Sequence, residues 1–407
     1  MFGFMFTNLA KIAAPLRRLG NAQALILVAP LFLFLLVTFF VPIAATLWQS
    51  VSDPLARQAL PRTIAALGEF DGSSLPDSPA FAGLQHDLKT TAPETLAKAA
   101  VRINSDLPGF RSLLFKTVTA VSAEPATLTG PDFVAIDARW GQIATWAAIK
   151  RAGGPLTDAN LLAALDLKRT DQGAIAKVAP DKALFAGMLV RTVVMAAWVT
   201  LICLIVGFPL AYFIASSPPR RAGFLMIFIL LPLWTSILVR TLSWTVLLQR
   251  EGIVNAVLAG LGAGGAPFDL MFNRMAVYVG MTHILLPFMV LAIFSVMKAF
   301  PDGYLRAASS LGAKPFTVFR RVYLPLVMPG VVSGCLLVFI QALGAYITPV
   351  LLGNPNDQTI APIIAFYVTK SSNWGLAAAL SLILLVAIVL LSSVYRSIAG
   401  GKTVGVV

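Results

Sequence analysis

Six apolar runs, each long enough to cross a hydrocarbon core as a helix, constrain this 407-residue chain more than any other feature. A transmembrane helix needs about 20 residues at a rise of about 1.5 Å each. Apolar residues make up 58% of the chain and charged residues only 12%, and the mean hydropathy of +0.83 is far above that of soluble proteins. The sequence therefore predicts an all-α integral membrane protein. The spans are expected at about residues 24–48, 184–215, 222–248, 275–297, 323–348 and 374–396.

Basic residues predict the orientation of these spans, because Lys and Arg are retained on the cytoplasmic side. Four segments carry twelve Lys or Arg and a single acid, Asp302: the N-terminus, the turn at Arg220 and Arg221, the 298–322 loop and the C-terminal tail. A six-span topology places all four on one side. We therefore expect both termini in the cytoplasm, and most of the net charge of +13 needs no nucleic-acid partner to explain it.

The segment 51–181 differs from the rest of the chain, since it holds 14 of the 18 acids together with 13 Lys or Arg. Its near-neutral balance and its helical apolar spacing predict a mostly helical soluble domain outside the membrane. The chain then divides into a first span with its N-terminus (1–50), this external domain, a five-helix core (182–398) and a short tail (399–407). Both cysteines fall inside predicted spans, so neither indicates a disulfide framework.

Residues 302–325 form an unusual stretch between two spans, because they combine cationic side chains with two glycines and two prolines. Gly312 is typical of a helix end and Pro315 of a helix start, so we expect a helix, a turn and a second helix on the cytoplasmic side. Small residues around the turn and an apolar face after it would suit docking into a partner's groove. This docking face comprises Phe316, Phe319, Val322 and Leu324. The alternative is a basic loop that only fixes topology.

The same stretch resembles the "EAA" loop of the membrane subunits of binding-protein-dependent ABC importers. The resemblance rests on the order Ala-Ala, three residues, Gly312, nine residues, Val322, one residue, Leu324-Pro325. Four further stretches, at residues 199–215, 230–255, 285–298 and 342–360, are similar to the spermidine/putrescine-type permease subfamily. The similarity spans about residues 184–396. The loop residues that it marks for coupling are Arg306, Ala307, Ala308, Gly312, Ala313, Phe316, Val322, Leu324 and Pro325.

This resemblance implies a permease of type I ABC importer architecture, in a bacterial inner membrane, that forms half of a translocation pathway. It implies three partners: a cytoplasmic ATPase dimer that docks on the loop, a second permease and a periplasmic substrate-binding protein. The external domain would either receive that binding protein or serve as a spacer or cap. Arg306 departs from the family, which has Glu at this position. A polyamine, an opine, an amino-acid derivative or an organic acid are all open as substrates.

The sequence lacks a nucleotide-binding P-loop, and this absence bears on the source of energy for transport. The tail "GGKT" at residues 400–403 misses the upstream glycine of a nucleotide-binding P-loop and follows a membrane helix instead of a strand. ATP and Mg²⁺ would therefore bind on the partner ATPase, and this chain is expected to bind no cofactor or metal of its own. No acid lies within a predicted span, which disfavours a secondary transporter, and two histidines leave no catalytic cluster. An uncoupled secondary transporter or channel is the alternative function.

Three polar residues within the predicted spans are candidates for the translocation pathway: Arg240, His283 and Gln341. A charge at membrane depth is costly unless it faces the bundle interior. Arg240 would either pair with carbonyls or snorkel to the interface, or line the pathway. His283 and Gln341 would either form interhelical hydrogen bonds or contact the solute.

Overall fold

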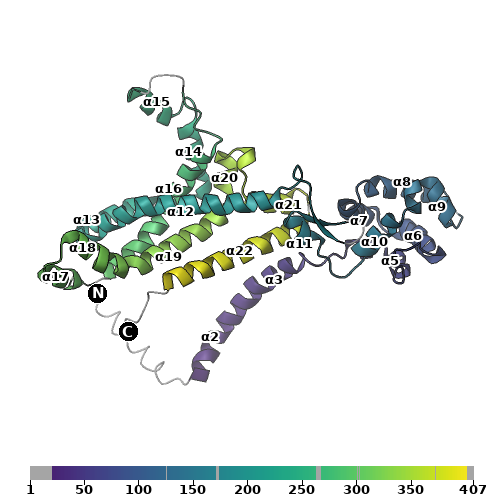
Figure 1. The fold of residues 1–407 in the computed structure, drawn as a ribbon, viewed down its shortest axis with the longest axis horizontal. Coiled ribbons are helices and arrows are strands. Elements are labelled where there is room, and N and C mark those ends of the chain that lie inside the picture. Colours follow the sequence, from purple (N-terminus) through teal and green to yellow (C-terminus); the bar gives the residue numbers. More distant parts are fainter. Residues whose placement is uncertain are drawn as a thin grey trace. The chain divides into compact units, whose positions relative to one another are not determined.

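The chain forms two compact units, which meet in the sequence between Asp158 and Ala159 (Figure 1). The computed structural model describes residues 21–124, 126–170, 174–262, 267–299, 301, 303–371 and 373–400. Several charges behind the predicted orientation lie outside the described residues: Lys11, Arg17, Arg18, Asp302 and Lys402. The end of the predicted tail, from residue 401, lies outside them as well.

The first unit begins with the predicted first span. Its elements are α2 (Asn21–Leu35), the π-helical η1 (Leu36–Phe40) and α3 (Val41–Trp48). Residues 28–48 are long and apolar enough to cross a membrane, and their side chains are not buried within the unit. Such a surface is expected of a helix surrounded by lipid or by other membrane helices.

A helical domain follows in the same unit. Its core contains two tryptophans with no exposed surface, Trp140 and Trp146, whose ring centroids are 5.3 Å apart. Each indole nitrogen donates a hydrogen bond: Trp140 to the Thr117 hydroxyl at 2.8 Å, and Trp146 to the Trp140 carbonyl at 2.9 Å. The domain therefore has an aromatic core of its own. Its elements are α4 (Leu55–Ala59), α5 (Pro61–Ala66), α6 (Ser78–Thr90), α7 (Pro93–Asp106), α8 (Phe110–Ala123), α9 (Gly130–Ile136), η2 (Ala138–Gly141) and α10 (Ile143–Ala152).

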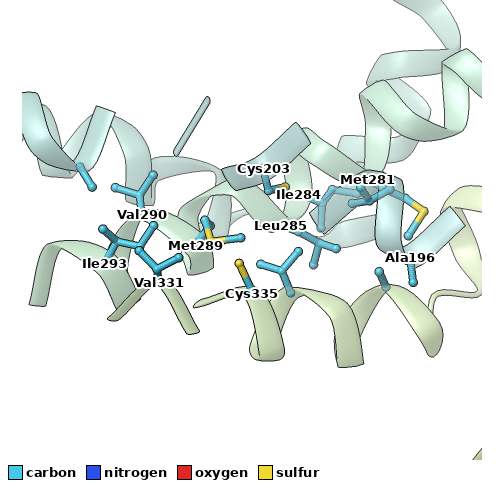
Figure 2. Close-up of a cluster of buried hydrophobic side chains, with 14 of the residues drawn as sticks. Ala196, Cys203, Met281, Ile284, Leu285, Met289, Val290, Ile293, Val331 and Cys335 are labelled. Atoms are coloured by element: carbon cyan, nitrogen blue, oxygen red, sulfur yellow. The ribbon is translucent and has the colours of Figure 1, made fainter. Parts of the chain in front are cut away.

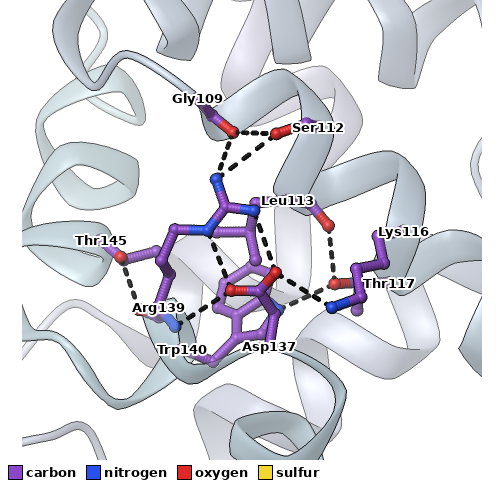
Figure 3. Close-up of polar contacts among 9 residues, drawn as sticks. All are labelled: Gly109, Ser112, Leu113, Lys116, Thr117, Asp137, Arg139, Trp140 and Thr145. Atoms are coloured by element: carbon purple, nitrogen blue, oxygen red, sulfur yellow. Dashed lines mark hydrogen bonds and ion pairs between the residues drawn. The ribbon is translucent and has the colours of Figure 1, made fainter.

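An ion-pair network closes the surface over Trp140 (Figure 3). The Arg139 guanidinium donates to both oxygens of Asp137, at 2.9 and 3.0 Å, and to the Gly109 carbonyl at 2.7 Å. Lys116 of α8 reaches the same carboxylate at 3.3 Å. Side-chain hydrogen bonds from Arg139 hold the pKa of Asp137 well below its usual range. The network thus joins η2 to α8 at the edge of the core.

The second unit contains most of the membrane helices. Helices α12, α16 and α19 pack against one another around buried side chains that include Met289, Val331 and the cysteines Cys203 and Cys335 (Figure 2). The elements of the unit are α11 (Ala159–Ala164), β1 (Leu167–Arg169), β2 (Ile175–Lys177), α12 (Phe185–Ala215), α13 (Pro219–Leu230), η3 (Leu231–Trp234), α14 (Ile237–Leu248), α15 (Ile253–Gly260), α16 (Arg274–Ala299), α17 (Gly303–Ser310), α18 (Pro315–Val318), η4 (Phe319–Tyr323), α19 (Leu324–Leu343), α20 (Ile347–Leu352), η5 (Pro355–Asp357), α21 (Ile360–Thr369) and α22 (Trp374–Gly400).

Glycines allow the three central helices to approach closely. A Cβ at Gly207 would lie 3.0 Å from Met289, and a Cβ at Gly330 would lie 2.9 Å from Val296 and 3.0 Å from the Ala292 carbonyl oxygen. Small residues at such crossings are typical of membrane helices, where packing rather than water exclusion stabilises association.

The boundary between the units falls after Asp158, earlier than the predicted external boundary at 181. The difference arises because α11 packs against α22 and the carboxylate of Asp166 caps α12. That carboxylate accepts hydrogen bonds from the backbone N–H groups of Leu184, Phe185 and Ala186, at 3.0, 3.1 and 2.7 Å. The antiparallel hairpin of β1 and β2 lies between Asp166 and α12, and within the described residues it is the one β-sheet.

The third predicted span is wrong as a straight helix. Within the described residues five helices are long and apolar enough to cross a membrane, and the sixth span is a pair bent by 96° between η3 and α14. Thr235 and Ser236 are extended at the break, and the Ser236 hydroxyl caps α14 by accepting a hydrogen bond from the Leu238 N–H. Irregular backbone of this kind is tolerated at membrane depth where protein or a cavity surrounds it.

Candidate functional site: the 302–325 corner and the α14–α16 contact

The predicted helix, turn and helix are present at the 302–325 stretch. Helix α17 ends in a Schellman motif, in which Ala313 N–H donates to the Ala308 carbonyl at 3.2 Å and Gly312 N–H donates to the Ser309 carbonyl at 3.0 Å. Gly312 has a φ of +82°, so it occupies the left-handed region that disfavours any residue with a Cβ. We call residues 303–318, which comprise α17, the turn and α18, the corner.

The corner exposes apolar and cationic side chains together. Leu311 is 88% exposed and Phe316 is 72% exposed, while Tyr304 is 56% exposed. Arg306 and Lys314 are also exposed, and α17 has no buried residue. Leu305 of α17 is half-buried and packs against the core of the second unit, so this contact and the hydrogen bonds at Gly312 together position the helix.

The second helix of the corner continues directly into the membrane. Residues Pro315–Leu343 form one apolar helix in which the π-helical turn η4 joins α18 to α19. The prediction of two short helices is therefore wrong for the second one. Pro325 lies inside this continuous helix, directly after the π-helical turn η4, and it does not end the helix.

Aromatic contacts fix η4 to the end of α12. The rings of Phe319 and Phe208 meet edge to face at 6.3 Å, and those of Tyr323 and Tyr212 do so at 5.5 Å. Of the predicted docking face, only Phe316 is largely exposed, whereas Phe319 is 36% exposed. Val322 and Leu324 are half-buried, and of the small residues Ala307 is exposed while Ala308 and Ala313 are half-buried.

A second polar group lies where α14 meets α16. The Trp244 indole N–H donates to Nδ1 of His283 at 3.1 Å, so this ring nitrogen carries no proton and the imidazole is neutral with its proton on Nε2. Nearby, the hydroxyls of Thr241 and Thr348 lie 3.3 Å apart and join α14 to α20. The sequence alone does not indicate this hydrogen bond, because the two partners are 39 positions apart.

Arg240 belongs to the same helix, one turn before Trp244. Its Nε and Nη1 atoms have almost no solvent-accessible surface and no hydrogen-bond partner among the described residues. Arg240 therefore lies one helical turn from the hydrogen bond between Trp244 and His283. Gln341 is half-buried on α19, and no hydrogen bond within the described part of the chain joins it to either residue. The structure thus brings together two of the three candidate pathway residues.

No group of three or more His, Cys, Asp or Glu residues in the described ranges could hold a metal ion. The chemistry that the arrangement offers is mechanical and electrostatic: an exposed corner joined to a membrane helix, and a half-buried cation one helical turn from the contact with a neutral imidazole.

Comparisons with known proteins agree in the region of these sites. Residues 207–402 match the family described as binding-protein-dependent transport system inner membrane component. The spermidine/putrescine transport system permease protein PotB of Haemophilus influenzae is 35% identical over 212 residues, which cover 52% of this chain and 74% of PotB. PotB of Escherichia coli is 34% identical over 212 residues, which cover 52% and 77%. A crystal structure of a bacterial alginate ABC transporter, in complex with an alginate pentasaccharide-bound periplasmic protein, is 15% identical with a TM-score of 0.48 and covers 55% of this chain and 81% of that chain.

Proposed function

The chain belongs to the family of inner-membrane components of binding-protein-dependent transport systems, and from that membership we propose that it imports a polyamine under the control of a separate ATPase. It is a multi-pass permease subunit of an ABC importer. The proposal extends this in three respects: the ATPase docks on the corner, a second permease completes the pathway, and a periplasmic protein delivers the solute.

The observation that carries the coupling proposal is the continuity of the corner with α19. A force applied to α17 reaches α18 through the turn at Gly312, and from Pro315 onward a single helix leads to Leu343. Since packed helices shift between discrete arrangements rather than bend continuously, movement of the corner would shift α19 against α12 and α16. Alternating access requires such a connection between an ATPase and the membrane helices.

Charge reversal at Arg306 tests docking. Arg306 is exposed on α17 and carries a positive charge where the resembling loop carries Glu. We propose that the cognate ATPase presents an acid here, so Arg306→Glu should weaken the complex by about 1–3 kcal/mol, measured as retention of the ATPase during purification. Lys298→Glu, the same charge change at the end of α16, serves as control. Equal losses in both variants, or full retention in Arg306→Glu, would contradict docking through this residue.

The polyamine assignment follows the permeases to which this chain is similar, and it is tested on the binding protein that co-purifies with the transporter. We expect this protein to retain spermidine or putrescine in preference to opines, amino-acid derivatives and organic acids. Retention of an organic acid with no polyamine would exclude the assignment.

Arg240 and His283 are proposed pathway residues, and Arg240→Gln should change the transport rate without preventing ATPase retention.

A further inference from the structure

A groove of about 380 Å³ lies where α12 passes into α13, away from the corner and from Arg240 in the sequence. Phe213 from the end of α12 and Phe224 and Leu225 from α13 line it, together with Arg220 and Arg221. Both phenylalanines are 60% exposed, so the unit itself does not fill the groove. The accessible lining of the groove is apolar, and the side chains of Arg220 and Arg221 border it.

Neither arginine makes a hydrogen bond or an ion pair with another described residue, and both are exposed. Arg220 and Arg221 follow the Pro218-Pro219 turn directly, at the start of α13. In the proposed orientation this turn lies at the cytoplasmic surface, where lipid headgroups of that leaflet carry negative charge.

An apolar stripe continues the groove along α13. Phe224, Ile227, Phe228 and Leu231 are spaced as one helical face and are between 50% and 60% exposed. The rings of Phe224 and Phe228 pack edge to face at 4.9 Å. A ligand that fits the whole surface has an anionic head at the arginines and an apolar chain along the helix.

We propose that this groove binds one anionic phospholipid, with its phosphate between Arg220 and Arg221 and an acyl chain along Phe213, Phe224 and the stripe on α13. Planar guanidinium groups match phosphate oxygens in two-point hydrogen bonds. A pair of arginines therefore favours a ligand with a phosphate over a purely apolar ligand. The charge complementarity and the length of the apolar track together favour a lipid over a second protein helix, which would leave the two cations without acceptors.

The test uses the full chain in detergent with phosphatidylglycerol and phosphatidylcholine as probes, and counts bound lipid by native mass spectrometry. Wild-type protein should retain phosphatidylglycerol in preference to phosphatidylcholine. The double variant Arg220→Gln/Arg221→Gln should bind phosphatidylglycerol about 30-fold more weakly. Arg320→Gln/Arg321→Gln is the matched control, since it removes another exposed adjacent pair, and it should keep wild-type affinity.

A second variant separates the groove from charge alone. Phe224→Glu keeps both arginines but places a carboxylate on the lining of the groove. Because Phe224 is 60% exposed, this substitution is not expected to unfold the protein. It should also lose phosphatidylglycerol. Three results would overturn the proposal: equal affinity for the two lipids, equal losses in both arginine pairs, or efficient cross-linking of a cysteine at position 224 to the second permease with no lipid retained by the assembled transporter.

Discussion

At the scale of single residues, the ion pair of Asp137 with Arg139 contributes to how the helical domain of the first unit responds to acid. Asp137 accepts hydrogen bonds from Arg139 and Lys116, and its pKa is lowered in the folded protein mainly by Arg139. A carboxyl whose pKa is lower in the folded than in the unfolded state stabilises the fold above its unfolded pKa of about 4. This contribution disappears as the pH falls through the lower folded-state value.

Asp137→Asn should therefore destabilise the domain by about 1 kcal/mol at pH 7, and its stability should fall less steeply than that of wild type between pH 5 and the acid limit. Limited proteolysis of the full chain in detergent, repeated across this pH range, measures both effects. Asp77→Asn is the control because Asp77 is exposed and its side chain caps no helix. Parallel acid profiles for Asp137→Asn and wild type would contradict the role given to this pair.

Residues differ in how far their environment can be predicted from the sequence. The left-handed turn at Gly312 is a local property, since glycine three residues before a proline is sufficient to indicate it. The environment of His283 is not local, because the indole that binds it comes from another helix. Phe319 was expected on a docking face for its helical spacing, but its contact with Phe208 depends on the packing of α12.

At the scale of elements, apolar length predicts where the membrane helices lie but not where they break. The third span was expected to be continuous because its composition is apolar throughout, whereas extended Thr235 and the Ser236 cap divide it. Hydropathy averages over such a break and does not detect it. The start of α18 at Pro315 was predicted correctly, while its continuation through η4 depends on contacts with α12.

The close packing of α19 against α16 gives a prediction at this scale. Gly330→Ala should destabilise the bundle by about 1–3 kcal/mol, because the new methyl group would meet Val296 and the Ala292 carbonyl oxygen at about the distances given above. Gly187→Ala in α12 is the control, since a Cβ there meets nothing within 4 Å. Thermal unfolding in detergent compares the two variants. If both melt at the wild-type temperature, the helices do not depend on this close approach.

At the scale of the whole molecule, the folds of the two units could be predicted from the sequence to different extents. The membrane unit contains the residues matched to the family, 207–402, whereas the helical domain of the first unit lies outside them. Its helical character follows from apolar periodicity, but its aromatic core required the structure, because Trp140 and Trp146 meet Phe81, Phe110 and Phe133 from other helices. Whether the domain receives the binding protein or acts as a spacer stays a prediction.

Orientation is also tested on the whole molecule. With Cys203 and Cys335 replaced, a cysteine at Ser73 should react with an impermeant thiol reagent added outside intact cells, and a cysteine at Ser310 should not. Both serines are exposed, so access to the reagent depends on the side of the membrane. Labelling at Ser310 but not at Ser73 would reverse the topology.

We propose that the corner transmits ATPase motion to α19, and Gly312→Val is the variant that tests this coupling. A Cβ in the left-handed region costs about 1–2 kcal/mol, and the branched side chain adds to this, so the Schellman motif should be lost although Leu305 of α17 still packs against the core. Gly303→Val is the matched control, because it adds the same side chain in open space on the same helix without a left-handed φ. In reconstituted transporter, ATP hydrolysis should remain stimulated by the loaded binding protein and coupled to uptake in Gly303→Val, and Gly312→Val should lose the ATPase or hydrolyse ATP without uptake. Wild-type coupling of hydrolysis to uptake in Gly312→Val would contradict the account.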